Sequence, residues 1–311
     1  MADSIKVFAP ATVANLTCGF DILGLAINGP GDELVAKKTN GRGVTIVSIE
    51  GDEGRLSKDA SKNTAGISAS QFLQAIDYRG GIEISLHKKM PFGSGMGSSA
   101  ASAVAGVFAV NELLGRPLSQ SELLRFAVEG ERIACGSGHA DNVAPSLLGG
   151  ITLVRSYEPL EVLSLPVPPN MYVAVLHPAV EVSTGDARAI LPKEVAMKAS
   201  VKYAGNLAGF VLALYTNDLG LMRRTLIDEI VEPKRASLIP YFYEIKEAAL
   251  SSEGVIGFGI SGSGPAMFAL ADGLEAITKA GRVMESILKK RGISANLYIS
   301  EVNTLGPKIL D

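Results

Sequence analysis

The chain reads Lys89-Met-Pro-Phe-Gly-Ser-Gly-Met-Gly-Ser-Ser-Ala-Ala-Ser102 where a glycine-rich loop passes into a run of small residues. Glycine permits backbone angles and close approaches that a Cβ would forbid. We predict a helix over 97–114, whose first turn offers unpaired N–H groups and a positive dipole end to an anion such as phosphate. The hydroxyls of Ser98 and Ser99 suit a phosphate oxygen or a Mg²⁺ shell. A plain turn before a buried helix does not need so many glycines, so the stretch predicts a phosphate-binding loop.

Other well-known loops do not fit this chain. The Walker A loop needs a Gly-Lys pair, and the sequence contains none. The dinucleotide fingerprint GxGxxG fails because Ser98 stands at the position of its third glycine. Protein-kinase signatures are missing, and the stretch 259–263 breaks the GxSxG elbow of hydrolases at its last position.

Size and charge limit the class of protein. A chain of 311 residues exceeds the roughly 250–300 residues at which one core stops growing, so we predict two domains. A formal net charge of −3 provides no basic field for nucleic acid. No apolar run approaches the roughly 18 residues of a membrane span. Cys18 and Cys135 lie far apart without a CxxC, and the start lacks the build of a signal peptide, so we expect reduced thiols in a cytoplasmic protein.

Strand-like and helix-like patterns are mixed along the whole chain. Short apolar or alternating runs predict strands, and longer runs at helical spacing predict helices. The predicted strands are 5–11, 33–38, 44–50, 82–87, 151–155, 161–165, 172–177, 255–260, 266–271 and 296–302. The predicted helices are 64–76, 97–114, 139–147, 195–214, 239–250 and 274–290, with one more after the capping box that begins at Ser119. We therefore predict an α+β fold, with a proline-rich joint at 166–169 between domains 1–166 and 167–311.

The glycine loop resembles the PxxxGLGSSAA motif of the GHMP small-molecule kinases, with Met96 in place of the usual Leu. Two more segments, 9–24 and 257–266, look like the first and third motifs of that family. Further segments resemble the form that homoserine kinases have, and these are 130–132, 139–150 and 177–188. The resemblance covers essentially the whole chain.

The resemblance implies a ribosomal-protein-like α+β first domain, a ferredoxin-like second domain, and a nucleotide that meets the substrate at their joint. ATP is then expected at the loop residues Pro91, Phe92, Gly93, Ser94, Gly95, Met96, Gly97, Ser98, Ser99, Ala100 and Ala101. In the family, the second serine and a glutamate from a later helix complete the Mg²⁺ shell, which corresponds here to Ser99 and Glu131. Composition alone favours the alternative that Glu131 is a surface charge paired with Arg125 or Arg132.

Asp141 stands where some family members hold a candidate base for the acceptor hydroxyl. A carboxylate there accepts a proton or orients a neighbouring cation. The alternative is an N-cap, because Asp is common at the start of a helix. The predicted catalytic group is Ser99, Glu131, Asp141 and Asn142.

An amino-acid substrate requires opposite charges in one pocket, with arginine for its carboxylate and Asp or Asn oxygens for its ammonium group. The matched segments offer Arg188 and Arg235 for the carboxylate, although an ordinary solvated arginine is a serious alternative for Arg235. The predicted substrate-binding set is Asn15, Asp21, His139, Asn142, Thr184, Arg188, Arg235 and Gly262.

The function that the resemblance implies is phosphorylation of the side-chain hydroxyl of L-homoserine with ATP and Mg²⁺, as in threonine biosynthesis. A sibling kinase acting on a mevalonate-type or sugar-type alcohol is the nearest alternative. A catalytically inactive nucleotide-binding sensor is an alternative of a different class. An exposed sheet edge in either domain offers a route to a homodimer, although no segment of the sequence establishes one.

Overall fold

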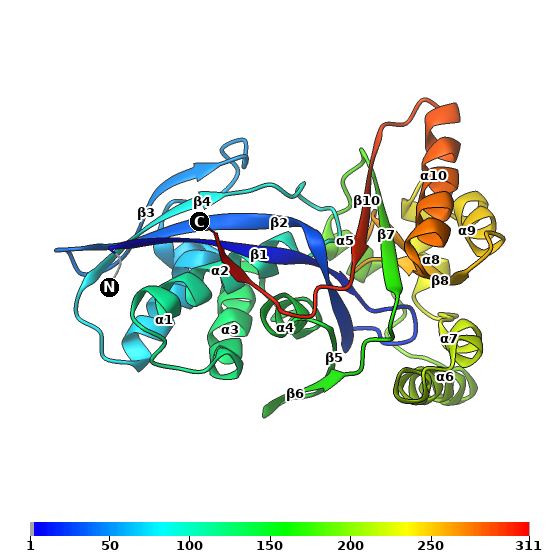
Figure 1. Ribbon diagram of the computed structural model, residues 1–311, viewed down its shortest axis with the longest axis horizontal. Coiled ribbons are helices and arrows are strands. Elements are labelled where there is room, and N and C mark those ends of the chain that lie inside the picture. Colours follow the sequence, from blue (N-terminus) through cyan, green and yellow to red (C-terminus); the bar gives the residue numbers. More distant parts are fainter. Residues whose placement is uncertain (1–2, 311) are drawn as a thin grey trace.

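The computed structural model describes residues 3–310, apart from the side chains of residues 134 and 135. Within that range the chain forms two sheets that lie beside each other (Figure 1). The first sheet has seven described strands in the order β11-β1-β2-β4-β3, with β5 added to β2 and β6 to β5. Its strands are β1 Ser4–Ala14, β2 Leu23–Thr39, β3 Gly43–Glu50, β4 Gly81–His87, β5 Ile151–Tyr157, β6 Leu160–Leu165 and β11 Lys308–Leu310.

Four helices lie on one side of the first sheet (Figure 1), and they are α1 Thr64–Ala75, α2 Ser98–Leu113, α3 Leu124–Cys135 and α4 Ala140–Leu148. Helices α1, α2 and α4 pack on strands, and α3 packs on α1 and α2. Helix α2 is built from small apolar residues, so it is buried on nearly all sides at the centre of this layer. A Cβ at Gly106 would lie 2.4 Å from the carbonyl oxygen of Ala65, which shows how closely α2 approaches α1. This packing fixes the position of the first turn of α2.

The second sheet is antiparallel and has the order β10-β7-β9-β8. Its strands are β7 Met171–Pro178, β8 Val255–Ile260, β9 Met267–Asp272 and β10 Ala295–Glu301, and helices α9 Phe242–Leu250 and α10 Leu274–Lys290 pack on it (Figure 1). The chain order of strand, helices, two strands, helix and strand is that of a ferredoxin-like unit. The predicted α+β class and the ferredoxin-like second unit are therefore confirmed.

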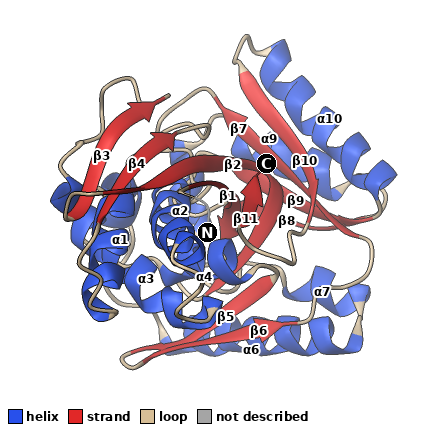
Figure 2. Ribbon diagram, turned by 60° about the vertical axis from the view of Figure 1, so that its left-hand side comes forward, coloured by secondary structure: helices blue, strands red, loops and turns tan. Residues whose placement is uncertain are grey.

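Several short helices connect β7 to β8. They are α5 Thr184–Ala189, α7 Leu219–Thr225 and α8 Glu232–Arg235, together with the long α6 Met197–Thr216. Short 3₁₀ turns occur at η1 Ala60–Lys62, η2 Gln120–Leu123 and η3 Ala236–Leu238. Helix α6 packs on α7 and runs beneath the hairpin of β5 and β6 (Figure 2).

Some boundaries differ from the sequence-based prediction. The strand predicted at 33–38 begins ten residues earlier, at Leu23, because its first part pairs with β1 and β5 even though Gly29, Pro30 and Gly31 indicate a turn. The capping box at Ser119 is present, but it opens the 3₁₀ turn η2, and α3 begins only at Leu124. The helix predicted from residue 239 begins at Phe242 because η3 and a short turn precede it.

The division of the chain into two domains at residue 166 stays a prediction. Strand β11, near the C-terminal end of the described chain, pairs with β1 in the first sheet, so the last residues return to the first half.

Cys18 is a buried free thiol, whereas the side chain of Cys135 lies outside those described. Among the described residues, no helix is both long enough and apolar enough to cross a membrane.

Candidate active site

A cavity of about 460 Å³ opens at the N-terminus of α2, and residues from both halves of the chain line it. The glycine loop and α4 contribute from the first half, and α5, α8 and the turn after β8 contribute from the second. The predicted site residues that line it are Phe92, Gly93, Ser94, Gly95, Gly97, Ser98, Ser99, Asn15, Asp21, Glu131, His139, Asp141, Asn142, Thr184, Arg188, Arg235 and Gly262. Residues up to 247 positions apart in sequence thus meet at one site.

The glycine loop is held by contacts that exclude side chains. Gly95 and Gly97 have φ values of 77° and 68°, in the left-handed region that favours glycine. A Cβ at Gly95 would lie 2.3 Å from the carbonyl oxygen of Ser261, and a Cβ at Gly97 would lie 2.2 Å from Thr12 Oγ1. Because no side chain caps α2 at Gly97, the N–H groups of its first turn are free to bind an anion at the cavity.

Four residues of the predicted nucleotide set do not line the cavity, namely Pro91, Met96, Ala100 and Ala101. The side chains of the last three are fully buried in the core. Met96 instead accepts a hydrogen bond from the backbone N–H of Thr12 through its carbonyl oxygen, at 3.1 Å. The side chains of Met96, Ala100 and Ala101 hold the loop in place. Any contact of these three residues with a nucleotide would come from their backbone atoms.

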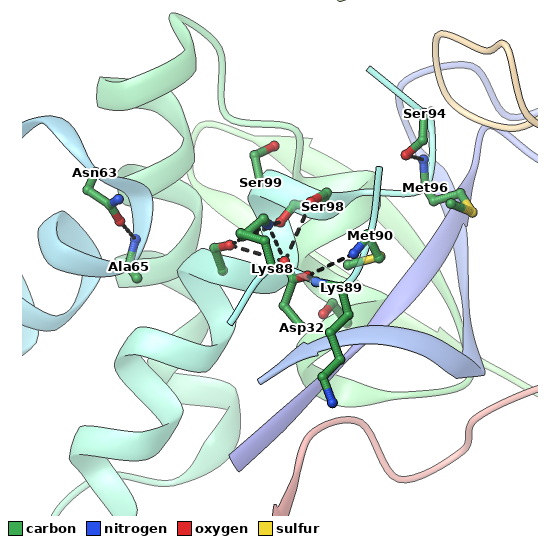
Figure 3. A network of polar contacts seen from close by, with 12 residues as sticks. Asp32, Asn63, Ala65, Lys88, Lys89, Met90, Ser94, Met96, Ser98 and Ser99 are labelled. Atoms are coloured by element: carbon green, nitrogen blue, oxygen red, sulfur yellow. Dashed lines mark hydrogen bonds and ion pairs between the residues drawn. The ribbon is translucent and has the colours of Figure 1, made fainter. Parts of the chain in front are cut away.

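A buried ion pair beneath the loop was not predicted (Figure 3). Lys88 Nζ forms an ion pair with Asp32 and donates to the Ser98 carbonyl oxygen and to Ser102 Oγ, both at 2.8 Å. Asp32 Oδ1 also accepts the backbone N–H groups of Lys89 at 3.0 Å and Met90 at 3.3 Å. The chain that enters the loop and the first turn of α2 are thereby joined through one carboxylate and one ammonium group.

Ser99 and Glu131 meet at the cavity as the resemblance implied. Ser99 Oγ donates to Glu131 Oε1 at 2.8 Å, and Glu131 is buried at 2% exposure with no partner for its Oε2 among the described atoms. The alternative of a surface pair with Arg132 is wrong, because Arg132 binds Glu129 instead. Hydroxyl and carboxylate oxygens are the ligands that Mg²⁺ prefers, and an unsatisfied buried carboxylate oxygen is the kind of group that a cation completes. The residues therefore fit a Mg²⁺ ion.

No group of three or more His, Cys, Asp or Glu side chains suited to a metal occurs among the described residues. Mg²⁺ does not require such a cluster, since it keeps several waters and often takes only one or two protein oxygens beside substrate phosphates. His139 Nδ1 lies 3.3 Å from Glu131 Oε1, and this contact raises the pKa of His139. A hydrogen bond joins His139 Nε2 and Ser137 Oγ at 2.9 Å.

Asp141 is buried inside the first turn of α4, with no partner for Oδ1 among the described atoms. The N-cap alternative is wrong, because His139 occupies that position. Burial raises the pKa of Asp141 to about 7, and the nearby charge of Asp21 adds to the effect. A carboxyl group that titrates near neutral pH is suited to accepting a proton. Its neighbour Asn142 accepts a hydrogen bond from Thr12 Oγ1 at 2.7 Å through Oδ1.

The two predicted arginines have different surroundings. Arg188 Nη2 donates to both carboxylate oxygens of Asp21, at 2.8 and 2.9 Å. Arg235 is buried and donates to two carbonyl oxygens, those of Ala187 at 3.1 Å and Gly262 at 2.7 Å. The alternative of a solvated arginine is therefore wrong for Arg235.

No carboxylate within the described part of the chain forms an ion pair with Arg235. Burial lowers the pKa of Arg235, as expected of a cation held away from water. A buried arginine of this kind at a cavity is suited to an anionic group of a ligand.

Asn15 and Thr184 complete the predicted set. Asn15 Nδ2 donates to the Gly262 carbonyl oxygen at 2.9 Å, and Asn15 Oδ1 accepts the backbone N–H of Asp21 at 3.0 Å. A hydrogen bond of 3.4 Å joins Thr184 Oγ1 and Ser263 Oγ. The structure thus places the glycine loop, the Ser99–Glu131 pair and a pocket of mixed charge around one cavity.

Comparisons with known proteins agree with this geometry. The family description "GHMP kinases N terminal domain" matches residues 63–150, and "GHMP kinases C terminal" matches residues 210–290. Homoserine kinase from Chlorobium phaeobacteroides strain BS1 is 44% identical, over 99% of both chains. The chain belongs to the homoserine kinase family of GHMP kinases.

Two solved structures resemble this chain to different degrees. The crystal structure of homoserine kinase from Cytophaga hutchinsonii is 54% identical and superposes with a TM-score of 0.98, covering 100% of this chain and 98% of that one. A mevalonate kinase structure matches with a TM-score of 0.69 at 13% identity, covering 97% and 99% of the two chains. The second likeness concerns the fold alone.

Proposed function

We propose that this chain transfers the γ-phosphoryl group of ATP to the side-chain hydroxyl of L-homoserine, giving O-phospho-L-homoserine and ADP. The observation that carries the proposal is the meeting, in one cavity, of an uncapped helix N-terminus and a buried arginine without a carboxylate partner among the described residues. The first suits the phosphates of a nucleotide, and the second suits the carboxylate of an amino acid. Membership of the homoserine kinase family supports the same pairing.

The phosphates are held by backbone more than by side chains. Phosphoryl transfer depends on positioning and on charge stabilisation, because the protein has little covalent chemistry to do. The glycines of the loop let its backbone approach the phosphates, and the first turn of α2 directs its N–H groups at them. The ion pair of Lys88 and Asp32 fixes the position of this turn relative to the start of the loop, because Lys88 binds the Ser98 carbonyl oxygen and Asp32 binds the Lys89 N–H.

We propose Ser99 and Glu131 as the residues that hold Mg²⁺. When bound, this ion neutralises charge on the β- and γ-phosphates. Glu131 is held in place by Ser99 and His139, and its remaining oxygen is buried without a partner among the described atoms. ATP and Mg²⁺ are thus both parts of the proposal.

The amino acid binds by its two charges. Its carboxylate pairs with Arg235 and Arg188, and its ammonium group pairs with Asp21 beside Asn15. The hydroxyl is then directed towards the phosphate loop, beside Asp141. Asp141 accepts the hydroxyl proton, for which its raised pKa is suited.

The competing functions make different predictions. A neutral sugar has no carboxylate for an arginine to bind. Mevalonate has a carboxylate, but it has no ammonium group for an acidic partner. An inactive sensor needs no oxygen pair for a metal, and here the Ser99–Glu131 pair is complete. A role in threonine biosynthesis is part of the same proposal, since it follows from the reaction. We also propose a cytoplasmic location.

The test is to incubate the purified chain with ATP, MgCl₂ and L-homoserine and to follow the product by ³¹P NMR and mass spectrometry. We expect one phosphomonoester on the side-chain oxygen and one equivalent of ADP. Binding of ATP without turnover of homoserine, mevalonate or galactose would identify the sensor instead.

A further inference from the structure

One aromatic ring is shared by the two arginines of the cavity. The Cζ atom of Arg188 lies 5.4 Å from the centroid of the Phe20 ring, and the Cζ atom of Arg235 lies 5.1 Å from it. Both distances are within the roughly 6 Å over which the face of a ring attracts a guanidinium group. Arg188 belongs to α5 and Arg235 ends α8, whereas Phe20 lies in the loop between β1 and β2. The ring thus connects three segments that are far apart in the sequence.

The ring offsets a repulsion between the two arginines. Burial lowers the pKa of Arg235, and the charge of Arg188 lowers it further, so the two cations are close enough to interact. The side chain of Arg188 is 46% exposed, and Asp21 binds only its Nη2. Repulsion alone would therefore move the guanidinium group of Arg188 towards water. The negative face of the Phe20 ring attracts both cations and so favours their staying together.

The loop that carries Phe20 has an unusual backbone. Asn15, Leu16, Thr17 and Asp21 have positive φ values of 75, 40, 59 and 62°. Such angles are costly for residues other than glycine, above all for the β-branched Thr17, and they persist only where surrounding contacts hold them. The position of Phe20 therefore depends on the contacts of this loop.

Tyr203 of α6 supplies such a contact at two points of the loop. Its Oη donates to the Thr17 carbonyl oxygen at 3.0 Å and accepts the N–H of Phe20 at 2.7 Å. One hydroxyl thus fixes the backbone from which the ring of Phe20 projects. Neither Phe20 nor Tyr203 lines the cavity, whereas Arg188 and Arg235 do.

We propose that Phe20 is a positioning residue that directs Arg188 and Arg235 at one carboxylate of the substrate, and that Tyr203 holds Phe20 in place. This inference rests on the proposed function, in which both arginines bind the carboxylate of the amino acid. Because Phe20 acts through the arginines, its effect is confined to the amino acid and does not extend to the nucleotide.

The first test measures the contact without any ligand. Protons over the face of an aromatic ring are shielded, so the Nε–Hε resonances of Arg188 and Arg235 should move downfield in Phe20→Leu. Proton–nitrogen correlation spectra of the ¹⁵N-labelled full chain at mildly acidic pH measure this shift. Phe20→Tyr keeps the ring and should keep both resonances near their wild-type positions. Unchanged resonances in Phe20→Leu would overturn the proposal.

The second test separates the two substrates kinetically. Phe20→Leu keeps an apolar side chain but loses two cation–ring contacts, so we expect KM for L-homoserine to rise about tenfold. KM for ATP and kcat should change little, and Phe20→Tyr should restore KM for homoserine to within about twofold of the wild type. Phe8→Leu is the matched control, because Lys308 lies over the Phe8 ring at 5.5 Å and Phe8 does not line the cavity.

Tyr203→Phe removes only the hydroxyl that holds the loop. The loss of its hydrogen bonds should raise KM for homoserine by about 3- to 10-fold and leave KM for ATP unchanged. Circular dichroism melts show whether each variant is folded at the temperature of the assay.

The outcomes distinguish this inference from the proposed function. A wild type that does not turn over homoserine would overturn the proposed function. Wild-type turnover with an unchanged KM for homoserine in a folded Phe20→Leu would overturn the role of Phe20 and leave the proposed function standing. An equal rise in KM for homoserine and for ATP would show that Phe20 only supports the fold of the site, which also overturns the inference.

Discussion

Ser99 Oγ donates to Glu131 Oε1 at 2.8 Å, while the second oxygen of Glu131 is buried without a partner among the described atoms. Helix α2 and helix α3 thus meet through a carboxylate that has spare capacity for a cation. This arrangement gives a first prediction.

Glu131→Gln should abolish Mg²⁺-dependent turnover while leaving the chain folded. The amide keeps the size of the side chain but cannot neutralise a divalent cation. We expect kcat to fall by at least about 100-fold, or about 2.7 kcal/mol of barrier. Titration of ADP release with MgCl₂ measures the effect, with Glu129→Gln, at a half-buried position of α3 paired with Arg132, as the control. Wild-type Mg²⁺ dependence in Glu131→Gln would contradict the proposed ligand role.

Asp141 predicts a stability that depends on pH. Its pKa in the folded chain, about 7, is raised above the ordinary value of 3.8, so its protonated form favours folding and this contribution is lost as pH rises through 7. Asp141→Asn, which stays neutral, should be more stable than the wild type at about pH 8, by up to about 4 kcal/mol. The gap should shrink towards about pH 5. Thermal melts across this range measure it, and a gap that does not vary with pH would contradict the burial argument.

Arg235 should determine affinity for the amino acid and not for the nucleotide. Arg235→Met removes the cation and should raise KM for homoserine by roughly 30-fold or more, from a loss of about 2 kcal/mol or more. KM for ATP should change little. Arg224→Met, at an exposed position of α7, is the matched control. An equal rise in both KM values would indicate that Arg235 supports the fold of the site and does not bind the substrate.

Lys88 should support the phosphate loop through Asp32. Lys88→Met leaves Asp32 as a buried charge without its partner, at a cost of about 3–5 kcal/mol in the free energy of unfolding. KM for ATP should rise because the first turn of α2 loses its anchor. The double variant Asp32→Asn/Lys88→Met removes both charges and should recover part of the stability in urea titrations. If the double variant is as unstable as the sum of the single ones, the two residues are not coupled.

The structure also shows which features a sequence can predict. The glycine loop and α2 were predictable because both depend on local residues, namely glycines at strained angles and a run of small helix formers. The pair of Asp32 and Lys88 was not, because its members are 56 residues apart and meet only through the pairing of β2 and β4.

Among the site residues, the pairing of Asp21 with Arg188 was not predictable either, because these two residues are also far apart in the sequence. Each residue was assigned to the substrate through a resemblance of its own segment, but their contact depends on how the two halves of the chain meet. The burial of Arg235 could not be inferred either, because its local sequence is that of a surface helix. Local motifs thus predict the chemistry of the site, and long-range packing determines which side chains contact one another.

The most direct test of the proposed function is the ratio of kcat/KM for L-homoserine to kcat/KM for mevalonate, measured by ADP release with purified wild-type chain. Arginines for a carboxylate and an aspartate for an ammonium group predict a ratio far above one. A ratio below one, with turnover of mevalonate and none of homoserine, would contradict it.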